Sequence, residues 1–186
     1  MQKRISANDF FHAWVASVNE MKIILQDNWR NATQFTSLVK SSEDCVLKLV
    51  AKQLGLNCYP HDYYSLDSVL YRDCDLVPDL PEHSYWFRSL TVAFEHENSI
   101  NSGIFKEVSH LLILDPELRV LVTYPISGIE EREWEYSHSI ISGSRNADSI
   151  SDQENFLVIF GGESGFVWEG YVYKKNGWKK LESRQN

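Results

Sequence analysis

The stretch Leu90-Thr-Val-Ala-Phe-Glu-His-Glu-Asn98 predicts the strand around which the rest of the fold is arranged. Its apolar and β-favouring residues run directly into Glu95 and Glu97, which is typical of a buried strand ending in two acids. Side chains alternate across a strand, so Glu95 and Glu97 share one face and His96 points to the other. Carboxylates at this place are costly unless water, a cation or hydrogen-bond donors compensate them, and Mg²⁺ prefers such oxygen ligands. The alternative is a strand that emerges into solvent with two ordinary acids on its rim.

The composition predicts one folded domain over residues 1–186. Hydrophobic residues make up 43% of the chain and aromatic residues 13%, which is enough for a substantial core. The three cysteines, Cys45, Cys58 and Cys74, form no CxxC pair and favour a reducing compartment over a disulfide framework or a zinc site. We expect no signal peptide, and no apolar run of the sequence approaches the roughly 20 residues that cross a bilayer. We therefore expect a cytoplasmic protein without a membrane span.

The net charge restricts the kind of nucleic-acid binding that the chain can perform. A formal charge of −8 argues against general nucleic-acid binding, because phosphate contacts need a basic surface. It does not exclude a nuclease, since an acidic centre is offset by the metal ion that it binds.

Residues 1–41 predict an N-terminal helical segment. An apolar stripe recurs at helical spacing from Asn8 to about Gln26, and Ser6 or Asn8 can cap the start of this helix. The stripe consists of Phe10, Trp14, Val18, Met21 and Leu25, widened by Phe11, Val15 and Ile24. A polar turn and a shorter helix near residues 34–40 follow. We assign the aromatic residues of this segment to the core.

Residues 42–124 predict the central part of the fold. The expected order is helix, strand, strand, strand, helix, strand, at residues 41–54, 57–62, 65–71, 85–97, 104–114 and 118–124. Ser41-Ser-Glu-Asp44 is close to a capping box at the start of the first helix, and Gly55 suits its C-terminal end. A strand, a helix and a strand in succession imply a parallel crossover within a mixed sheet. Asp67 interrupts an otherwise apolar strand, and an acid there faces either water or a site.

Residues 125–186 predict a C-terminal helix and strands that form a satellite to this core. The helix runs from a cap at Ser127 towards Ile141, and residues 143–155 form a polar loop. A buried strand over 156–160 precedes a hairpin whose turn contains Asn176-Gly177, a strong two-residue turn signal.

The order of elements over residues 42–124, with an acid in the second strand and an acid-x-acid at the end of the third, resembles the PD-(D/E)xK nuclease-like (restriction-endonuclease-like) superfamily. The resemblance implies an α+β (mixed α/β) fold in which helices flank a central mixed β-sheet, with N-terminal helices and a C-terminal β-hairpin added. It also implies that Asp67, Glu95 and Glu97 are catalytic residues that hold Mg²⁺ or Mn²⁺. Such ions lower the pKa of a bound water and stabilise the charge that builds on phosphorus.

The chain departs from the family pattern at one position. Glu97 stands where the family usually has a lysine, and it cannot supply a positive charge. Lys106 is either a displaced cation for the site or a solvated helix lysine. Glu43 is either a first-turn acid or a further metal-site carboxylate, and His96 is expected to be packed or exposed beneath the sheet and not catalytic.

These observations support three classes of function. The first is a Mg²⁺-dependent nuclease that hydrolyses phosphodiester bonds, with nucleic acid as its partner. The second is a non-catalytic protein on the same fold, acting as a regulatory or immunity-type protein-binding partner whose acidic surface mimics or blocks nucleic acid. The third is an unrelated α+β binding module. Because two active sites are convenient for cutting duplexes, and tryptophans near the termini leave room for an aromatic contact, a homodimer is also expected.

Overall fold

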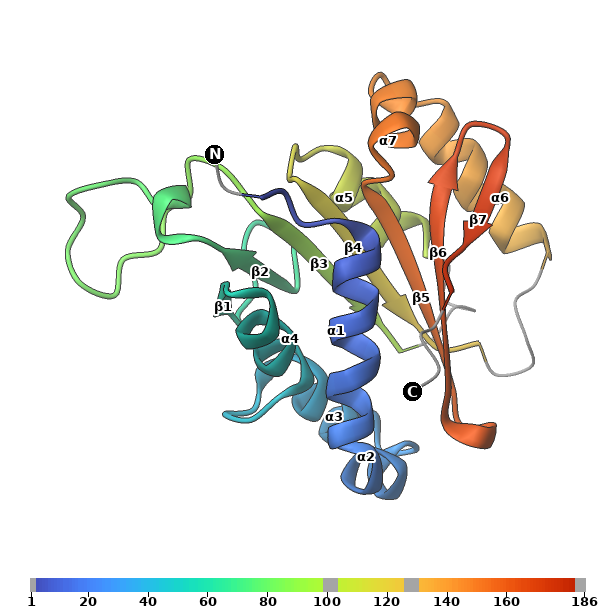
Figure 1. The fold of residues 1–186 in the computed structure, drawn as a ribbon, viewed down its shortest axis with the longest axis horizontal. Helices are drawn as coiled ribbons and strands as arrows, with labels where there is room; N and C mark the ends of the chain where they lie inside the picture. Colours follow the sequence, from blue (N-terminus) through green and yellow to red (C-terminus); the bar gives the residue numbers. More distant parts are fainter. Residues whose placement is uncertain (1–2, 99–103, 126–130, 183–186) are drawn as a thin grey trace.

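The computed structural model describes residues 3–98, 104–125 and 131–182 (Figure 1). Seven strands form one mixed sheet in the order β1 to β7. Their bounds are β1 Asn57–Tyr59, β2 Ser68–Tyr71, β3 Val92–Glu97, β4 Leu118–Thr123, β5 Phe156–Gly162, β6 Val167–Lys174 and β7 Gly177–Lys180. β3, β4 and β5 are parallel, whereas every other neighbouring pair is antiparallel. The predicted mixed sheet flanked by helices is confirmed.

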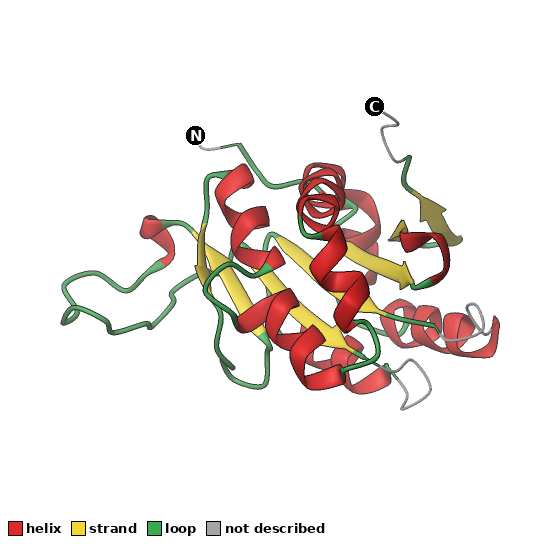
Figure 2. Cartoon of the chain, turned by 90° about the horizontal axis from the view of Figure 1, so that it is seen from below, coloured by secondary structure: helices red, strands yellow, loops and turns green. Residues whose placement is uncertain are grey.

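Helices cover both faces of the sheet, as the view along it shows (Figure 2). The first face carries α1 Ala7–Glu20, α2 Lys22–Asn28, α3 Ala32–Thr36, a π-helical turn at Ser37–Ser41 and α4 Val46–Leu54. The second face carries α5 Phe105–Leu112, α6 Glu131–Ser142 and α7 Ala147–Gln153. In the described ranges, none of these helices is long and apolar enough to cross a membrane.

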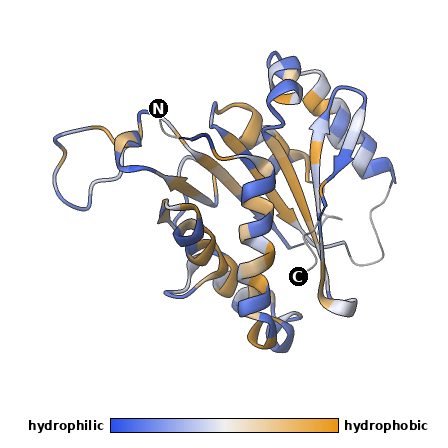
Figure 3. Ribbon diagram, viewed as in Figure 1, coloured by the Kyte–Doolittle hydropathy of each residue, from blue (hydrophilic) through white to orange (hydrophobic). Residues whose placement is uncertain are grey.

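The central strands are apolar on both faces, which is why they lie in the interior (Figure 3). Along β3, Val92 and Phe94 pack against α1 and α4, and Ala93 packs on the opposite side, against the cluster that contains α5. The first face is closely packed: a Cβ added at Gly170 on β6 would lie 2.8 Å from Cδ2 of Phe11 on α1. Only a residue without a side chain allows α1 to approach the sheet this closely.

Of the local predictions for the helix ends, two are confirmed and one is wrong. Ser6 caps α1, where its hydroxyl accepts a hydrogen bond from the Asp9 N–H at 3.0 Å. Gly55 ends α4 in the left-handed conformation, with a φ of 66°. The predicted capping box is wrong, because Ser41 ends the π-helical turn and α4 begins only after the extended residue Cys45. Ser127 falls outside the described residues.

The predicted N-terminal helix is broken in two. α1 ends at Glu20, and Met21 leaves the helical conformation with a ψ of 13° before α2 begins. Beyond this point Leu25 stays buried, but Ile24 is 45% exposed. The predicted stripe therefore stays on the core side through Met21 and Leu25, whereas Ile24, which was expected to widen it, faces outward.

Two predictions for the second half of the chain are wrong. Residues 125–186 are not a satellite: β5 pairs with β4 in the middle of the sheet, and β6 and β7 extend it. The loop predicted over 143–155 contains α7, which buries Ile150. In the centre, Tyr85-Trp-Phe87 does not open β3, because Phe87 makes only an isolated bridge to Leu76 and regular pairing starts at Val92.

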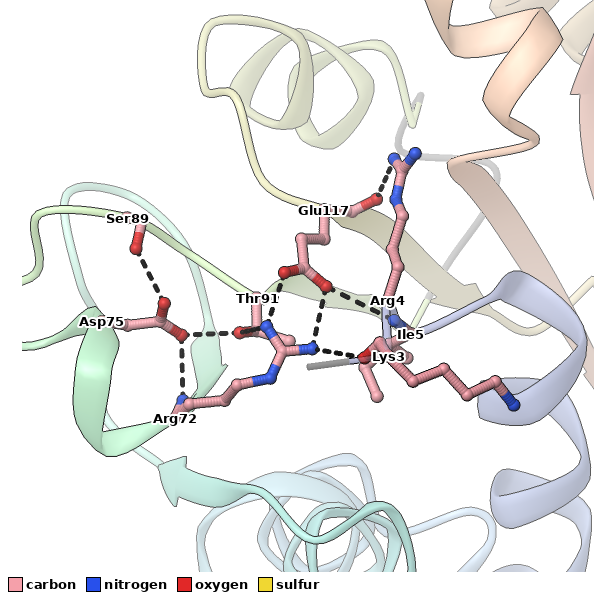
Figure 4. A network of polar contacts seen from close by, with 8 residues as sticks. All are labelled: Lys3, Arg4, Ile5, Arg72, Asp75, Ser89, Thr91 and Glu117. Carbon is pink, nitrogen blue, oxygen red and sulfur yellow. Dashed lines mark hydrogen bonds and ion pairs between the residues drawn. The ribbon is translucent and has the colours of Figure 1, made fainter. Parts of the chain in front are cut away.

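A network of charged side chains ties the start of β3 and β4 to the end of β2 (Figure 4). The Arg72 guanidinium donates to both carboxylate oxygens of Glu117, at 2.5 and 3.0 Å, and to the Thr91 hydroxyl at 3.0 Å. Asp75 accepts from the Arg72 N–H and from the hydroxyls of Thr91 and Ser89. Burial raises the pKa of Asp75, but these hydrogen bonds outweigh burial and leave it below its usual value.

Removing Arg72 should destabilise the protein, because Glu117 and Thr91 would lose their donor in a partly buried place. We expect Arg72→Met to lower the free energy of unfolding by about 2–4 kcal/mol, measured by urea denaturation. Arg88→Met is the matched control, since the exposed Arg88 side chain donates to the Cys74 carbonyl and takes no part in the Arg72 network, and it should change stability by less than about 1 kcal/mol. Equal losses of stability in the two variants would show that the Arg72 network does not stabilise the fold more than an exposed arginine does.

Candidate functional site

Strand pairing brings Asp67 and Glu95 together. β2 and β3 are antiparallel with Ser68 opposite Phe94, so Asp67, the residue before β2, comes opposite Glu95. Asp67 Oδ2 accepts a hydrogen bond of 2.7 Å from the backbone N–H of His96. The carboxylates thus meet at the edge of the sheet where the parallel strands end, although they are 28 positions apart in the sequence. Ligand sites in sheets of this kind are usually found at that edge.

Lys40 supplies a cation to this edge that the sequence did not predict. Its Nζ lies 2.5 Å from Asp67 Oδ1 and 3.5 Å from Asp62 Oδ1, and its side chain is only 15% exposed. The residue belongs to the π-helical turn at Ser37–Ser41, in which Leu38 and Val39 are buried. π-helical turns are rare in proteins, but those that occur are often found at functional sites. A lysine therefore reaches the carboxylates from a helix rather than from β3.

Glu95 carries the strongest electrostatic perturbation of the site. Its side chain is 4% exposed, and its pKa is raised to about 9 by burial and by the charges of Asp67 and Glu107. The Asp67 backbone N–H and Lys40 lower the pKa, but by less than burial raises it. His110 of α5 places Nδ1 3.2 Å from Glu95 Oε1. At neutral pH this carboxylate is held as the acid unless a cation compensates it.

Glu107 is a further acid of the site that the sequence did not single out. It lies one turn before His110 on α5, so both face the sheet from the same side of the helix. Burial raises its pKa, and the nearby Glu97 raises it further. Among the described residues, Glu107 Oε2 is buried without a hydrogen-bond partner. A signal was present, because Glu107 lies three residues after Ile104 and four before Leu111, both buried.

Glu97 lies on the same face of β3 as Glu95, but it is half-buried rather than buried. Its charge acts on Glu107, so it belongs to the same group of acids. Lys106 is exposed on α5, and the structure gives the cationic place to Lys40 instead. Glu43 is exposed in the turn before α4.

His96 lies on the opposite face of β3, as expected. It is buried, its Nε2 is 2.9 Å from the Tyr124 hydroxyl, and its ring stacks on Phe35 at a centroid distance of 6.3 Å. Burial, and to a smaller extent the charge of Lys40, lowers the pKa of His96 to about 3. The imidazole is thus neutral at physiological pH and packs beneath the sheet.

The side chains of the site are not gathered as a complete metal centre. Within the described part of the chain, no group of three or more histidine, cysteine or acidic side chains is arranged to hold a metal ion. The Lys40 ammonium already contacts one oxygen of Asp67. What the structure brings together is a group of acids, Asp67, Glu95, Glu97 and Glu107, with Lys40 and His110 as their basic neighbours.

A cavity of about 760 Å³ lies at the ends of β4 and β5, beside this group. Its wall includes Trp29, Asn98 and Tyr124, together with an exposed ion pair between Arg30 and Glu163. None of the four acids lines it. The cavity is therefore a neighbour of the acidic group and does not contain it.

Comparison of the chain with protein-family models, with curated proteins and with solved structures gave no match.

Replacing Glu95 by glutamine should stabilise the protein in alkali. The folded state keeps a proton on Glu95 up to about pH 9, whereas the unfolded state releases it near pH 4.5, so rising pH across this window favours unfolding. We expect Glu95→Gln to be more stable than the wild type at pH 8 by about 1–3 kcal/mol, and equal to it near pH 4, in thermal melts without divalent ions. Glu135→Gln, at an exposed position on α6, should follow the wild type. A Glu95→Gln protein that is less stable at pH 8 would contradict the buried, protonated carboxyl.

Proposed function

We propose that the protein hydrolyses phosphodiester bonds of nucleic acids with Mg²⁺, or with Mn²⁺ in its place. The observation that carries the proposal is the Glu95 carboxyl, buried opposite Asp67 with a pKa raised to about 9. A buried acid among further acids is destabilising unless a proton or a cation neutralises it. Perturbed acids of this kind are concentrated at functional sites.

The ligand type of the side chains suits a hard divalent ion, although within the described residues they are not arranged to hold one. Asp67, Glu95, Glu97 and Glu107 offer only oxygen ligands, which Mg²⁺ prefers over nitrogen and sulfur. The buried Glu107 Oε2 has no hydrogen-bond partner among the described residues, so one acceptor there is unused. Asp67, Glu95 and Glu97 would hold the ion, with Glu107 beside them. When bound, Mg²⁺ would lower the pKa of a water ligand and stabilise charge on the phosphoryl oxygens.

The chain's own residues would divide the remaining work. Lys40 places a positive charge at Asp67, where it can contact an oxygen of the scissile phosphate and offset the negative charge of the acids. Glu97, the more accessible of the two β3 acids, would accept a proton from the attacking water. His110 orients the Glu95 carboxyl through its contact at Oε1.

Metal binding and cleavage should both depend on Glu95. We expect calorimetric titration of Mg²⁺ and Mn²⁺ to show binding to the wild type and none to Glu95→Ala at millimolar metal. Cleavage of labelled DNA and RNA should require the metal and should fall at least about 100-fold in Glu95→Ala. Glu135→Ala, an exposed α6 position, is the control and should bind and cleave as the wild type does. A wild type that binds neither ion would rule the nuclease out.

Lys40, and not Lys106, should be the lysine required for cleavage. We expect Lys40→Met to lower kcat by about 10- to 100-fold, because the charge beside Asp67 is lost, and Lys40→Arg to retain part of the rate. Lys106→Met should leave the rate unchanged, since Lys106 is exposed on α5. The comparison is made with single-turnover kinetics on proteins whose circular dichroism matches the wild type. A large loss of rate in Lys106→Met with no loss in Lys40→Met would show that Lys106 is the required lysine.

One observation favours the alternative, a non-catalytic regulatory or immunity-type protein that binds another protein. The ion pair of Lys40 with Asp67 already compensates one acid without a metal ion. In this alternative the acids and the net charge of −8 serve recognition of a basic partner. It is supported if neither Mg²⁺ nor Mn²⁺ binds in the titration above.

A further inference from the structure

An aromatic pocket lies beside the acidic group. It has a volume of about 420 Å³ and is formed by the β1–β2 connection and by the long loop that precedes β3, which projects from one end of the molecule in Figure 1. Its wall consists of Tyr59, Asp62, Tyr63, Tyr64, His83, Ser84, Tyr85 and Trp86. We call this set of residues the aromatic pocket.

The rings at the mouth of the aromatic pocket are open to solvent. Tyr64 is 65% exposed and Trp86 is 52% exposed, and their ring centroids are 6.3 Å apart. They stand on an ordered layer of inner rings, in which Tyr63 contacts Phe87 edge-on at 4.9 Å. Large aromatic side chains left exposed together usually mark a binding surface.

The backbone holds this arrangement at a cost. Tyr64 has a φ of 47° and His83 a φ of 66°, so a residue on each of the two loops is in the left-handed region, which is unfavourable for side chains other than glycine. Strained residues of this kind are concentrated at binding sites.

The aromatic pocket adjoins the acidic group through one lysine. Asp62 lines the pocket and lies 3.5 Å from Lys40 Nζ, and the same Nζ contacts Asp67. A ligand whose charged part lies at Lys40 and Asp67 can therefore place a neighbouring ring in the pocket.

The lining determines which chemistry the pocket accepts. It contains neither lysine nor arginine, and Asp62 is its one acid, so it does not suit a phosphate. The faces of the tyrosine and tryptophan rings suit a flat, uncharged heteroaromatic ring, because every nucleobase stacks on such faces. Asp62 can accept a hydrogen bond from an exocyclic amino group, as acids do from cytosine.

We infer that the aromatic pocket binds an unstacked nucleobase of a single-stranded nucleic acid, next to the phosphodiester bond that the acidic group cleaves. The inference rests on the proposed function for the reaction, but the binding itself does not require it. A base within a duplex is stacked on both faces and paired with its partner, so it cannot enter the pocket. Single strands or single-stranded ends are therefore the substrate class.

Binding is tested without cleavage, by fluorescence anisotropy of labelled 12-nucleotide DNA and RNA strands of mixed sequence in EDTA. We expect Trp86→Ala and Tyr64→Ala each to weaken binding by about tenfold, and Trp86→Phe to keep most of the affinity because it keeps a ring. Tyr136→Ala is the matched control: Tyr136 is 50% exposed on α6 and does not line the pocket. Thermal melts establish that each variant is folded.

Four results would overturn the inference, and the first three concern strand binding itself. These three are no binding of single strands by the wild type, binding that Trp86→Ala leaves unchanged, and binding of a matched duplex at least as tight as that of the single strand. Displacement of the strand by millimolar tetramethylammonium chloride would instead show a pocket for organic cations, and would also overturn it.

Cleavage with Mg²⁺ separates this inference from the proposed function. If strands are cut but Trp86→Ala changes neither binding nor cleavage, the pocket inference fails and the nuclease stands. If single strands bind through Trp86 and are not cut under any metal condition, the nuclease fails and the binding pocket stands.

Discussion

The ion pair between Arg72 and Glu117 is the interaction on which the arrangement of the sheet depends most. It joins the residue that follows β2 to the residue before β4, and Arg72 also reaches the Lys3 carbonyl and Thr91, the residue before β3. Asp75 closes the base of the long loop through Ser89 and Thr91. One end of the sheet is thereby fixed, so β2 is held beside β3 along its length. The meeting of Asp67 with Glu95, and the projection of the aromatic loop, both follow from that register.

The two faces of β3 make opposite demands on pH. Glu95, with a pKa of about 9, contributes stability that is lost as pH rises above about 4.5. His96, with a pKa of about 3, has the reverse effect. Below about pH 6.5 the histidine of the unfolded state binds a proton, whereas the buried histidine stays neutral, so stability falls as pH falls. Adjacent residues of one strand thus restrict the pH range of the fold from both sides. A cation at Glu95 would relax only the alkaline limit.

The sequence predicted well what is decided locally. β4, the centre of β5 and the hairpin of β6 and β7 were predicted from apolar runs and a local turn signal. The turn itself lies one residue earlier than predicted, at Lys175-Asn176, because Gly177 already pairs with Lys174 in the ladder. The resemblance to the PD-(D/E)xK nuclease-like superfamily implied that Asp67 and Glu95 belong together, and strand pairing places them opposite each other. The sequence could not predict that β5 enters the middle of the sheet, because a buried strand has the same pattern wherever it pairs. The role of Lys40 was missed because its contact with Asp67 spans 27 positions and is set by tertiary packing.

The place of Lys40 shows what a carboxylate site requires from the chain. Electrostatic compensation depends on where a charge lies and not on which element carries it, so glutamate at 97 does not by itself leave the acids without a cation. The π-helical turn makes this possible: Leu38 and Val39 fill the core while Lys40, next in sequence, is turned towards Asp67. A π-helical turn contains more residues than an α-helical one, so a regular α-helix through Ser37–Ser41 would rotate these side chains relative to one another and could not satisfy the core and the acid together. The irregular turn is therefore the feature that links the N-terminal helices to the chemistry of the sheet.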